Sequence, residues 1–384
     1  MNVLVLNGSP SGENSITLQT VNYIAKHFPE DSFEVLHVAQ KIKGIEKDFT
    51  ESRKLLEEAD LILFCYPVYT FLVPAQLHRF VELMKESGLD LSKKAATQIS
   101  TSKHFYDTTA HRFIQDNAND MQIPYIRGLS ADMEDLLKPK GQKEALDYYR
   151  FVSWSIKERV FEPVPAKEEV RPLKEASVPE TEDPLKEKKA DVVIVTDIEE
   201  REDSALQKMI GRFCKTMEAE VRIVNLRTFP FKGGCLGCFH CASDGTCIYT
   251  DGFDSYLREN IQKADAIVYA YTIRDHSMGY RFKLYDDRQF CNGHRTVTMG
   301  KPVGYLVDGW LESETNLQIL MESRAQVGGN FLAGIATNMK DTDEEIDRLS
   351  KTLSYAIENN FQMPKNFYGV GGLKIFRDLI YQMR

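Results

Sequence analysis

The sequence predicts an α/β protein of two doubly wound domains, each a five-stranded parallel sheet with helices on both faces. Three observations lead to this fold class. Short apolar runs alternate with helical stretches, the same order of elements occurs twice, and a charged, proline-rich segment separates the two halves. Alternating strands and helices are typical of βαβ units, in which neighbouring strands run parallel. A chain of 384 residues also exceeds one ordinary hydrophobic core and fits two domains of average size.

The first half, residues 1–160, begins with a short apolar strand, a turn and a helical stretch over 15–27, which together form a first βα unit. A helix is expected before the third strand and another over 106–119. Runs of apolar and β-branched residues this short are typical of strands. The strands expected in this half are Val3–Leu6, Phe33–Val38, Leu61–Cys65, Ala95–Thr101 and Pro124–Ile126.

The second half, residues 190–360, repeats this order, with helices expected over 203–218 and 253–263. Five strands in each half suit a flavodoxin-like order, in which ligands bind outside the carboxyl ends of the strands. The strands expected here are Val192–Thr196, Val221–Asn225, Ala266–Tyr271, Val303–Val307 and Phe331–Ala336.

The two halves also resemble each other locally. Segment 58–63 reads EADLIL and segment 263–268 reads KADAIV, and each leads into the third strand of its half. We interpret the chain as a divergent tandem duplication, and the alternative is that any two α/β domains look this similar. Such halves are expected to pack as a pseudo-dimer within the chain, and assembly of two chains into a homodimer remains open.

Two segments lie outside the repeated pattern. Residues 161–189 hold five prolines among glutamates and lysines with no periodic apolar face, which is typical of a partly extended linker. The alternative is a long ordered surface loop. Residues 361–384 carry apolar side chains at helical spacing, so the tail is expected to be an amphipathic helix that docks on this chain, seals a dimer or touches a membrane.

The composition narrows the class of protein. With 48 Lys and Arg against 57 Asp and Glu, the formal net charge is −9, which disfavours a general nucleic-acid or anionic-membrane binder. No apolar run approaches the ~20 residues that span a bilayer, and the N-terminus lacks the charged region and cleavage site of a signal peptide. Seven cysteines, an odd number, do not form a secreted disulfide framework. We therefore expect a cytoplasmic protein.

The turn after the first strand is the first candidate site. Segment 7–17 is rich in glycine, serine and asparagine and runs directly into a helix. Backbone N–H groups and hydroxyls at a helix N-terminus favour a phosphate group. The pattern is neither a P-loop nor the spaced glycines of a dinucleotide fold. An ordinary Ser- or Asn-capped helix is the alternative.

Two further loops end strands at the same edge of the predicted sheet. The segment Tyr66–Phe80 contains a proline–aromatic loop, which offers a rigid backbone and a flat ring to a planar heterocycle. The segment Ser100–Lys103, after the next strand, is small and polar. A structural turn is the alternative for the proline–aromatic loop. Together the three loops would contact the phosphate, the ring and the far side of the ring of one ligand.

These motifs carry a family resemblance. Gly8-Ser9-Pro10 with Asn14-Ser15, followed by the Tyr66–Tyr69 loop, resembles the NAD(P)H-dependent FMN reductase family of flavodoxin-like proteins. The resemblance implies bound FMN, NAD(P)H as co-substrate and no identified catalytic residue. The residues it assigns to the FMN phosphate are Ser9, Ser11, Asn14, Ser15 and Ile16. Those it assigns to the flavin ring are Pro67, Val68, Tyr69, Ser100, Thr101 and Ser102. The family often has a basic residue at the position of Ser11.

The second candidate site is a group of cysteines spaced C-x2-C-x2-C-x5-C, at Cys235, Cys238, Cys241 and Cys247. Compact runs of this kind hold iron–sulfur clusters, whereas structural zinc normally uses two separated pairs of ligands. The spacing resembles the motif of iron–sulfur flavoproteins, which implies a 4Fe–4S cluster. A metal-free thiol loop and a zinc site remain alternatives. The other cysteines, at 65, 214 and 291, are expected to be small core residues.

The corresponding turn in the second half, segment 196–203, has no glycine and five acids. Acidic side chains repel phosphate, so we expect one FMN per chain, in the first half. The segment Arg274–Gly279 resembles the flavin loop of the family, although Thr272-Ile273-Arg274 replaces its Pro-Val-Tyr. Among the histidines, His276 is the first candidate for proton transfer.

The sequence thus predicts an FMN-dependent oxidoreductase that passes reducing equivalents from NAD(P)H or a reduced carrier to a small acceptor such as a quinone or a flavin. A 4Fe–4S cluster is a possible relay. The alternatives are an electron carrier with FMN and a cluster but no substrate of its own, with a redox protein as partner, and a binding protein whose cysteine loop senses redox state or a metal.

Overall fold

The computed structural model describes residues 1–164, 172–180, 190–199, 204–292 and 297–382. The chain forms two compact units. The first contains the described residues of 1–167 together with Gly234–Cys238, and the second contains those of 168–233 and 239–384. The short segment Gly234–Cys238, although distant in sequence, therefore belongs with the N-terminal unit.

The first unit is built on a parallel five-stranded sheet with the order β2-β1-β3-β4-β5. This is the flavodoxin-like order, in which the first and third strands are neighbours at the point where the chain reverses direction across the sheet. The strands are β1 Asn2–Asn7, β2 Ser32–Leu36, β3 Leu61–Pro67, β4 Ala95–Ser102 and β5 Leu129–Asp132.

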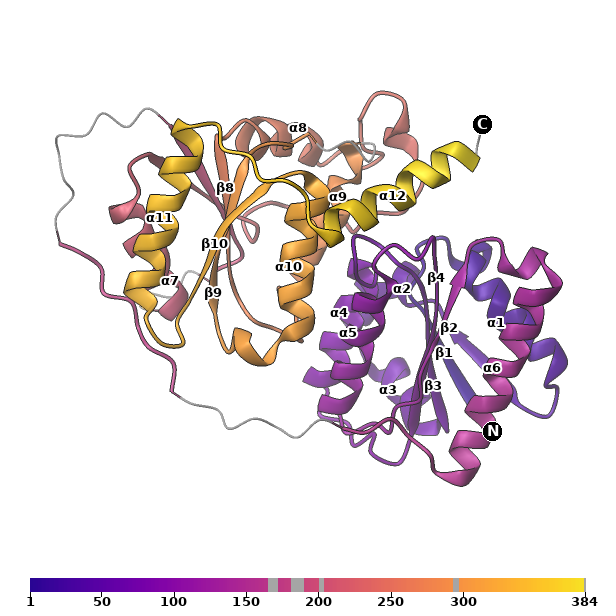
Figure 1. The fold of residues 1–384 in the computed structure, drawn as a ribbon. Coiled ribbons are helices and arrows are strands. Elements are labelled where there is room, and N and C mark those ends of the chain that lie inside the picture. The colour runs from indigo at the N-terminus through magenta and orange to yellow at the C-terminus, as the bar shows by residue number, and fades with distance from the viewer. Residues whose placement is uncertain (165–171, 181–189, 200–203, 293–296, 383–384) are drawn as a thin grey trace. The chain divides into compact units, whose positions relative to one another are not determined.

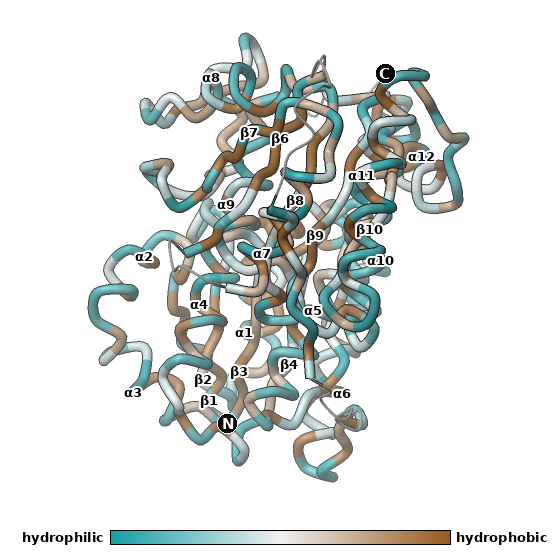
Figure 2. Tube along the Cα trace, turned by 90° about the vertical axis from the view of Figure 1, so that its left-hand side faces the viewer, coloured by the Kyte–Doolittle hydropathy of each residue, from teal (hydrophilic) through white to brown (hydrophobic). Residues whose placement is uncertain are grey.

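Helices cover both faces of this sheet. Figure 1 shows α1 and α6 on one face and α4 and α5 on the other. The strands β1, β3 and β4 are buried along nearly their whole length. The hydropathy colouring in Figure 2 marks β1 and β3 as apolar. The helices are α1 Ile16–His27, α2 Val38–Ile45, α3 Thr50–Glu58, α4 Ala75–Glu86, α5 Asp107–Asp120 and α6 Pro139–Glu158.

The position of the fifth strand differs from the prediction. Pro124–Ile126, expected as a strand, forms only an isolated bridge between Tyr125 and Ala96, and β5 begins at Leu129. From the bridge to the first β4–β5 pair, β4 advances from 96 to 99 while the other segment advances from 125 to 129. The extra residue interrupts the pairing, as in a β-bulge. The strand prediction for this segment was therefore wrong by a few residues.

The second unit repeats the architecture with the order β10-β9-β8-β6-β7, again all parallel. Two five-stranded parallel α/β domains are therefore confirmed, and the duplication itself remains a prediction. The strands are β6 Asp191–Thr196, β7 Glu220–Asn225, β8 Ala266–Thr272, β9 Pro302–Asp308 and β10 Phe331–Thr337.

In the second unit α7 and α11 cover one face of the sheet, and α9 and α10 cover the other (Figure 1). The predicted helix over 253–263 is only partly α-helical, because α8 passes into a π-helical turn at Arg258–Gln262. The helices are α7 Ala205–Thr216, α8 Phe253–Leu257, α9 Gly279–Arg288, α10 Thr315–Gly328, α11 Thr342–Glu358 and α12 Phe367–Gln382.

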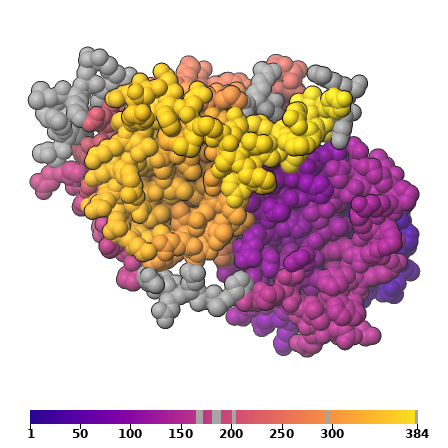
Figure 3. Space-filling view, in the orientation of Figure 1, coloured from indigo at the N-terminus to yellow at the C-terminus, as the bar shows by residue number. Residues whose placement is uncertain are grey.

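The predicted linker and tail have described parts in the second unit. Residues 172–180 run along its surface, where the Lys174 N–H donates to the Asn338 carbonyl at 2.7 Å and Ala176 is buried. Residues 165–171 and 181–189 of the predicted linker lie outside the described residues. The tail helix α12 packs beside α10 and, as Figure 3 shows, lies at the surface. No helix in the described ranges is long and apolar enough to cross a membrane.

Candidate functional site

The turn between β1 and α1 is held by its own hydrogen bonds. The Asn7 side chain donates to the Gly12 carbonyl at 3.0 Å and accepts from the Ser9 N–H at 3.1 Å. The Ser9 hydroxyl accepts from the Ser11 N–H at 3.3 Å, and Ser9 is only 4% exposed. The Gly8 N–H donates to the Cys65 carbonyl at 2.8 Å, which ties the turn to β3. The loop is therefore preformed.

Helix α1 begins directly after this turn. Ser15 is the N-cap, and its Oγ accepts from the Leu18 N–H at 3.3 Å. The next two residues, Ile16 and Thr17, have backbone N–H groups that no intrahelical carbonyl can reach. Their position and the helix dipole make this end of α1 suited to an anion. Ser11, Asn14 and Ile16 are exposed beside it, whereas Ser15 is buried.

Gly12 gives the turn its shape. Its φ is +57°, and a Cβ at this position would lie 2.2 Å from the Gln40 side-chain nitrogen. The Gln40 amide in turn donates to the Pro10 carbonyl at 3.4 Å. A larger residue would meet both a strained backbone and a steric clash, so the close approach requires glycine.

The proline–aromatic loop follows β3 at the same edge of the sheet. Pro67 ends the strand, and the Val68 N–H donates to the Thr101 carbonyl at 3.2 Å. Tyr69 and Leu72 exchange backbone hydrogen bonds of 2.8 and 3.0 Å across a tight turn, in which both intervening residues have positive φ. Pro67, Val68 and Tyr69 are partly exposed on this rigid loop.

The third predicted segment lies at the carboxyl end of β4. Its three predicted residues, Ser100, Thr101 and Ser102, are all buried. Ser100 Oγ lies 2.7 Å from His111 Nε2, and Ser102 Oγ accepts from the His104 N–H at 2.8 Å. Thr101 is 5% exposed, and its hydroxyl has no hydrogen-bond partner among the described residues. A buried hydroxyl without a partner is costly, so its partner is expected to be a ligand or water.

Beside this loop lies a polar group that the sequence did not single out. His104 Nδ1 lies 2.8 Å from Asp107 Oδ2, and the Ser130 hydroxyl donates to the same carboxylate. Burial opposes ionisation of Asp107, but the hydrogen bonds from Ser130 and His104 outweigh it and lower the pKa of the carboxyl below its usual value. A cavity of about 610 Å³ opens next to His104 and Ser130. His104 and Asp107 are three residues apart, whereas Ser130 lies in β5, so sequence spacing does not bring the three residues together.

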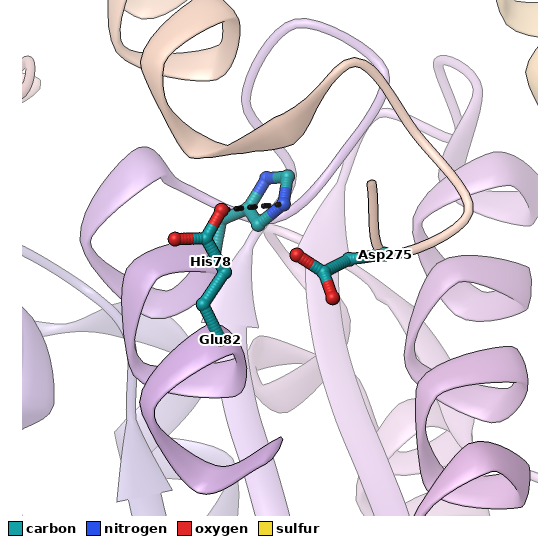
Figure 4. A group of neighbouring side chains, drawn as sticks. All are labelled: His78, Glu82 and Asp275. Atoms are coloured by element: carbon teal, nitrogen blue, oxygen red, sulfur yellow. Dashed lines mark ion pairs between the residues drawn. The ribbon is translucent and has the colours of Figure 1, made fainter. Parts of the chain in front are cut away.

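A further pair lies on α4, one turn after the proline–aromatic loop. His78 is fully buried, and its Nε2 lies 4.0 Å from Glu82 Oε1 (Figure 4). The ring of His78 also packs edge-on against Phe113, with 4.7 Å between the ring centroids. Figure 4 additionally draws Asp275, a residue of the β8–α9 loop in the second unit.

Part of the cysteine motif belongs to the first unit. In the segment Gly234–Cys238 the Cys235 carbonyl accepts from the Gln76 amide at 3.2 Å. A Cβ on Gly237, whose φ is +61°, would lie 2.1 Å from the Tyr69 hydroxyl. Within this unit, two of the predicted metal ligands therefore lie on a segment that contacts the proline–aromatic loop.

The other two motif cysteines lie in the second unit. Cys241 Sγ lies 3.3 Å from the Phe290 carbonyl, beside the next residue, Cys291. Burial raises the pKa of the Cys291 thiol to about 11, and the nearby Cys247 and Cys241 sulfurs add to the shift. Cys291 was expected to be an ordinary core residue, and it is indeed buried. It also lies near the two motif cysteines Cys241 and Cys247. Among the described residues of either unit, no three cysteine sulfurs lie within 4.8 Å of one another.

The carboxyl edge of the second sheet differs in chemistry from that of the first. Asp197, directly after β6, is 3% exposed, and residues 200–203 of the acidic turn lie outside the described residues. His276 Nδ1 lies 3.0 Å from the Glu314 carboxylate, so this histidine is held in place by an acid. No glycine-rich anion turn is present in the described part of this edge.

The family model of NADPH-dependent FMN reductase matches residues 1–122. No curated protein matches the chain.

Three solved structures are similar to part of this chain. An NAD(P)H:quinone oxidoreductase from Methanothermobacter marburgensis is 13% identical, covers 41% of this chain and 96% of its own, and has a TM-score of 0.33. General stress protein 14 from Treponema denticola, in complex with FMN, is 14% identical over 40% of this chain and 98% of its own, with a TM-score of 0.32. An FMN-dependent NADH-azoreductase from Bacillus anthracis is 13% identical over 41% and 99%, with a TM-score of 0.29.

The matched residues include β1, β3 and β4 and the three loops that follow them. Within the N-terminal domain, residues 1–122 are thus similar to the NADPH-dependent FMN reductase family.

Proposed function

We propose that the protein is an FMN-dependent oxidoreductase that carries reducing equivalents from NAD(P)H to a small-molecule acceptor such as a quinone or a flavin. The observation that carries this proposal is the carboxyl edge of the first sheet. There, a preformed turn at a free helix N-terminus, a rigid proline–aromatic loop and a buried hydroxyl without a partner lie on neighbouring strands β1, β3 and β4.

The residues present fit FMN. The N–H groups of Ile16 and Thr17 and the hydroxyls of Ser9 and Ser11 suit its phosphate, and Gly12 lets the Gln40 side chain pack against the turn. Val68 and Tyr69 offer a flat, partly exposed surface for a ring. Thr101 Oγ1 would supply a hydrogen bond at the ring edge. When bound, FMN supplies hydride and single-electron chemistry, and the protein supplies binding, orientation and electrostatics.

Side chains around the ring position would then tune the reaction. The Asp107 carboxylate orients His104, which borders the cavity beside Ser130. Ser100 is held by His111 and fixes the end of β4. These residues position the site and do not by themselves perform a redox step.

The test is a spectrum and a turnover assay on protein purified without oxygen. We expect about one FMN per chain and oxidation of NAD(P)H on addition of a generic quinone. Protein that binds FMN but shows no turnover with any quinone or flavin would instead favour an electron carrier. Absence of FMN binding, even when FMN is supplied in excess, would overturn the proposal.

An electron-carrier function is the second candidate, because one observation favours it. The segment that carries Cys235 and Cys238 lies against Tyr69 and Gln76 within the first unit. A centre held by these thiolates would be near the proposed ring site, within the reach of electron transfer. Iron and acid-labile sulfide in anaerobic protein would support this function, whereas zinc without flavin would indicate a sensing or binding protein.

A further inference from the structure

Three arginines gather at the carboxyl edge of the second sheet, the edge at which the sequence predicted no anion site. Arg227 follows β7, Arg274 follows β8, and Arg281 lies in the first turn of α9. Because β8, β6 and β7 are neighbouring parallel strands, their carboxyl ends meet at one place. This place is the point where the strand order reverses, which is where open α/β sheets bind ligands.

The arginines surround a carboxylate. Arg227 Nε donates to the Asp197 carbonyl at 2.5 Å, and Arg274 Nη1 lies 3.7 Å from Asp197 Oδ2. A second acid, Glu199, pairs with Arg227 at 3.1 Å. Asp197 and Glu199 are thus both engaged by arginines. Arg281 has no ion-pair partner among the described residues.

The cluster also carries like-charge repulsion. Burial and then the positive charge of Arg281 lower the pKa of Arg227 below its usual value, although Asp197 and Glu199 oppose this shift. Burial raises the pKa of Asp197, and the nearby arginines, Arg274 first, oppose that rise. Arg281 and Arg274 therefore repel Arg227 at this edge, and a bound anion would relieve that repulsion.

We propose that the carboxyl edge of the second domain is a binding site for the phosphate group of a small phosphorylated ligand, held by the side chains of Arg227, Arg274 and Arg281. Guanidinium groups bind phosphate oxygens through paired, charge-assisted hydrogen bonds. The site differs from that of the first domain, where backbone N–H groups at a helix N-terminus suit the phosphate. This inference does not depend on the proposed function of the first domain.

The arginines differ in what their replacement would disturb. Arg227 bonds the Asp197 backbone and is 25% exposed, so its loss would also affect the local structure. Arg274 is 42% exposed and its nearest ion pair is long, and Arg281 is partly exposed. The double variant Arg274→Gln/Arg281→Gln therefore removes two phosphate partners with little cost to folding.

The experiment titrates the full chain with inorganic phosphate by calorimetry, in a Ser15→Asp background that blocks phosphate at the first-domain turn. We expect Arg274→Gln/Arg281→Gln to raise the phosphate dissociation constant about tenfold or more. The control Arg348→Gln/Lys351→Gln removes the same charge from the exposed face of α11 and is expected to leave binding within about twofold. Equal binding in the double variant and the control would overturn the proposal.

A variant that makes the cluster more positive distinguishes a change in phosphate binding from a loss of folding. Asp197→Asn removes a negative charge from the cluster and is expected to tighten phosphate binding about threefold or more. Weaker or unchanged binding in a folded Asp197→Asn protein would count against the site.

The source of the phosphate is identified by comparing NADP⁺ with NAD⁺ and FMN with riboflavin. A preference for the phosphorylated member of either pair, lost in the double variant, identifies that ligand, and a response to inorganic phosphate alone identifies free phosphate.

Discussion

Ser100 Oγ and His111 Nε2 lie 2.7 Å apart, which joins the end of β4 to α5 at the edge where the candidate flavin loops meet. Burial lowers the pKa of His111 to about 4, although the charge of Asp107 opposes the shift. The histidine is therefore neutral in the folded protein at pH 7. The link between strand and helix depends on this neutral form.

The first prediction concerns pH. In the unfolded chain a histidine takes up its proton near pH 6.5, whereas folded His111 does so only near pH 4. Its contribution to stability is thus complete above pH 6.5 and is lost as the pH falls from 6.5 towards 4. We expect the wild type to lose up to about 3 kcal/mol more than His111→Gln over this range. Denaturant unfolding at several pH values measures the free energy of unfolding of both proteins. Identical pH profiles would contradict the lowered pKa of His111.

The second prediction separates FMN binding from folding at the helix N-terminus. Asp is as good an N-cap as Ser, so Ser15→Asp should change the free energy of unfolding by less than about 1 kcal/mol. Its carboxylate would oppose a phosphate, and we expect FMN affinity to fall at least about tenfold. Ser9→Asp should have the same effect on FMN. The control Ser32→Asp, at the amino end of β2, should keep FMN, and full flavin occupancy in Ser15→Asp would refute the phosphate assignment.

The third prediction tests the shape of the turn with two glycines of one unit. Gly12→Ala combines a φ of +57° with a close approach to Gln40, and it should cost about 1–2 kcal/mol or more and weaken FMN binding. Gly44→Ala lies in α2 with nothing within 4 Å of the new Cβ, and it should stabilise the protein by about 0.5 kcal/mol. Thermal unfolding and a flavin titration report both effects. Unchanged stability and FMN affinity in Gly12→Ala would show that the turn is not constrained.

The fourth prediction uses the Thr101 hydroxyl, for which the described part of the chain offers no hydrogen-bond partner. Replacing it by a methyl group in Thr101→Val removes an unsatisfied polar atom, so the flavin-free protein should be equally stable or more stable by up to about 1 kcal/mol. FMN affinity should fall severalfold because a hydrogen bond is lost. The matched control Thr109→Val breaks a bond to the Phe71 carbonyl and should cost about 1–2 kcal/mol. A large loss of stability in flavin-free Thr101→Val would mean that its hydroxyl is satisfied within the protein.

The fifth prediction concerns the cysteines. If the motif holds an iron–sulfur cluster, Cys247→Ala should abolish the broad cluster absorbance and leave the flavin bands unchanged. Cys214→Ala, on α7 and outside the motif, should change neither. Protein purified without oxygen that contains no iron would rule out the cluster and leave the flavin function standing.

Contiguous motifs made much of this molecule predictable. The anion turn occupies residues 7–17, where glycine conformation, the Ser15 cap and the start of α1 are all local consequences of the sequence. The alternation of strands and helices likewise predicted both parallel sheets, because apolar strands this short must be covered by the helices between them. The fold class needed no long-range information.

The tertiary structure determines which residues that are distant in sequence become neighbours. One extra residue after Tyr125 moved the fifth strand to Leu129, a register effect that propensity alone does not contain. Cys291 lies near Cys241 and Cys247 only because the chain between them folds back. Arg227 follows β7, whereas Arg274 and Arg281 follow β8, and they lie near one another because parallel strands align their carboxyl ends. Local sequence specifies turns and helix caps, whereas groups gathered from separate strands become neighbours only when the sheet forms.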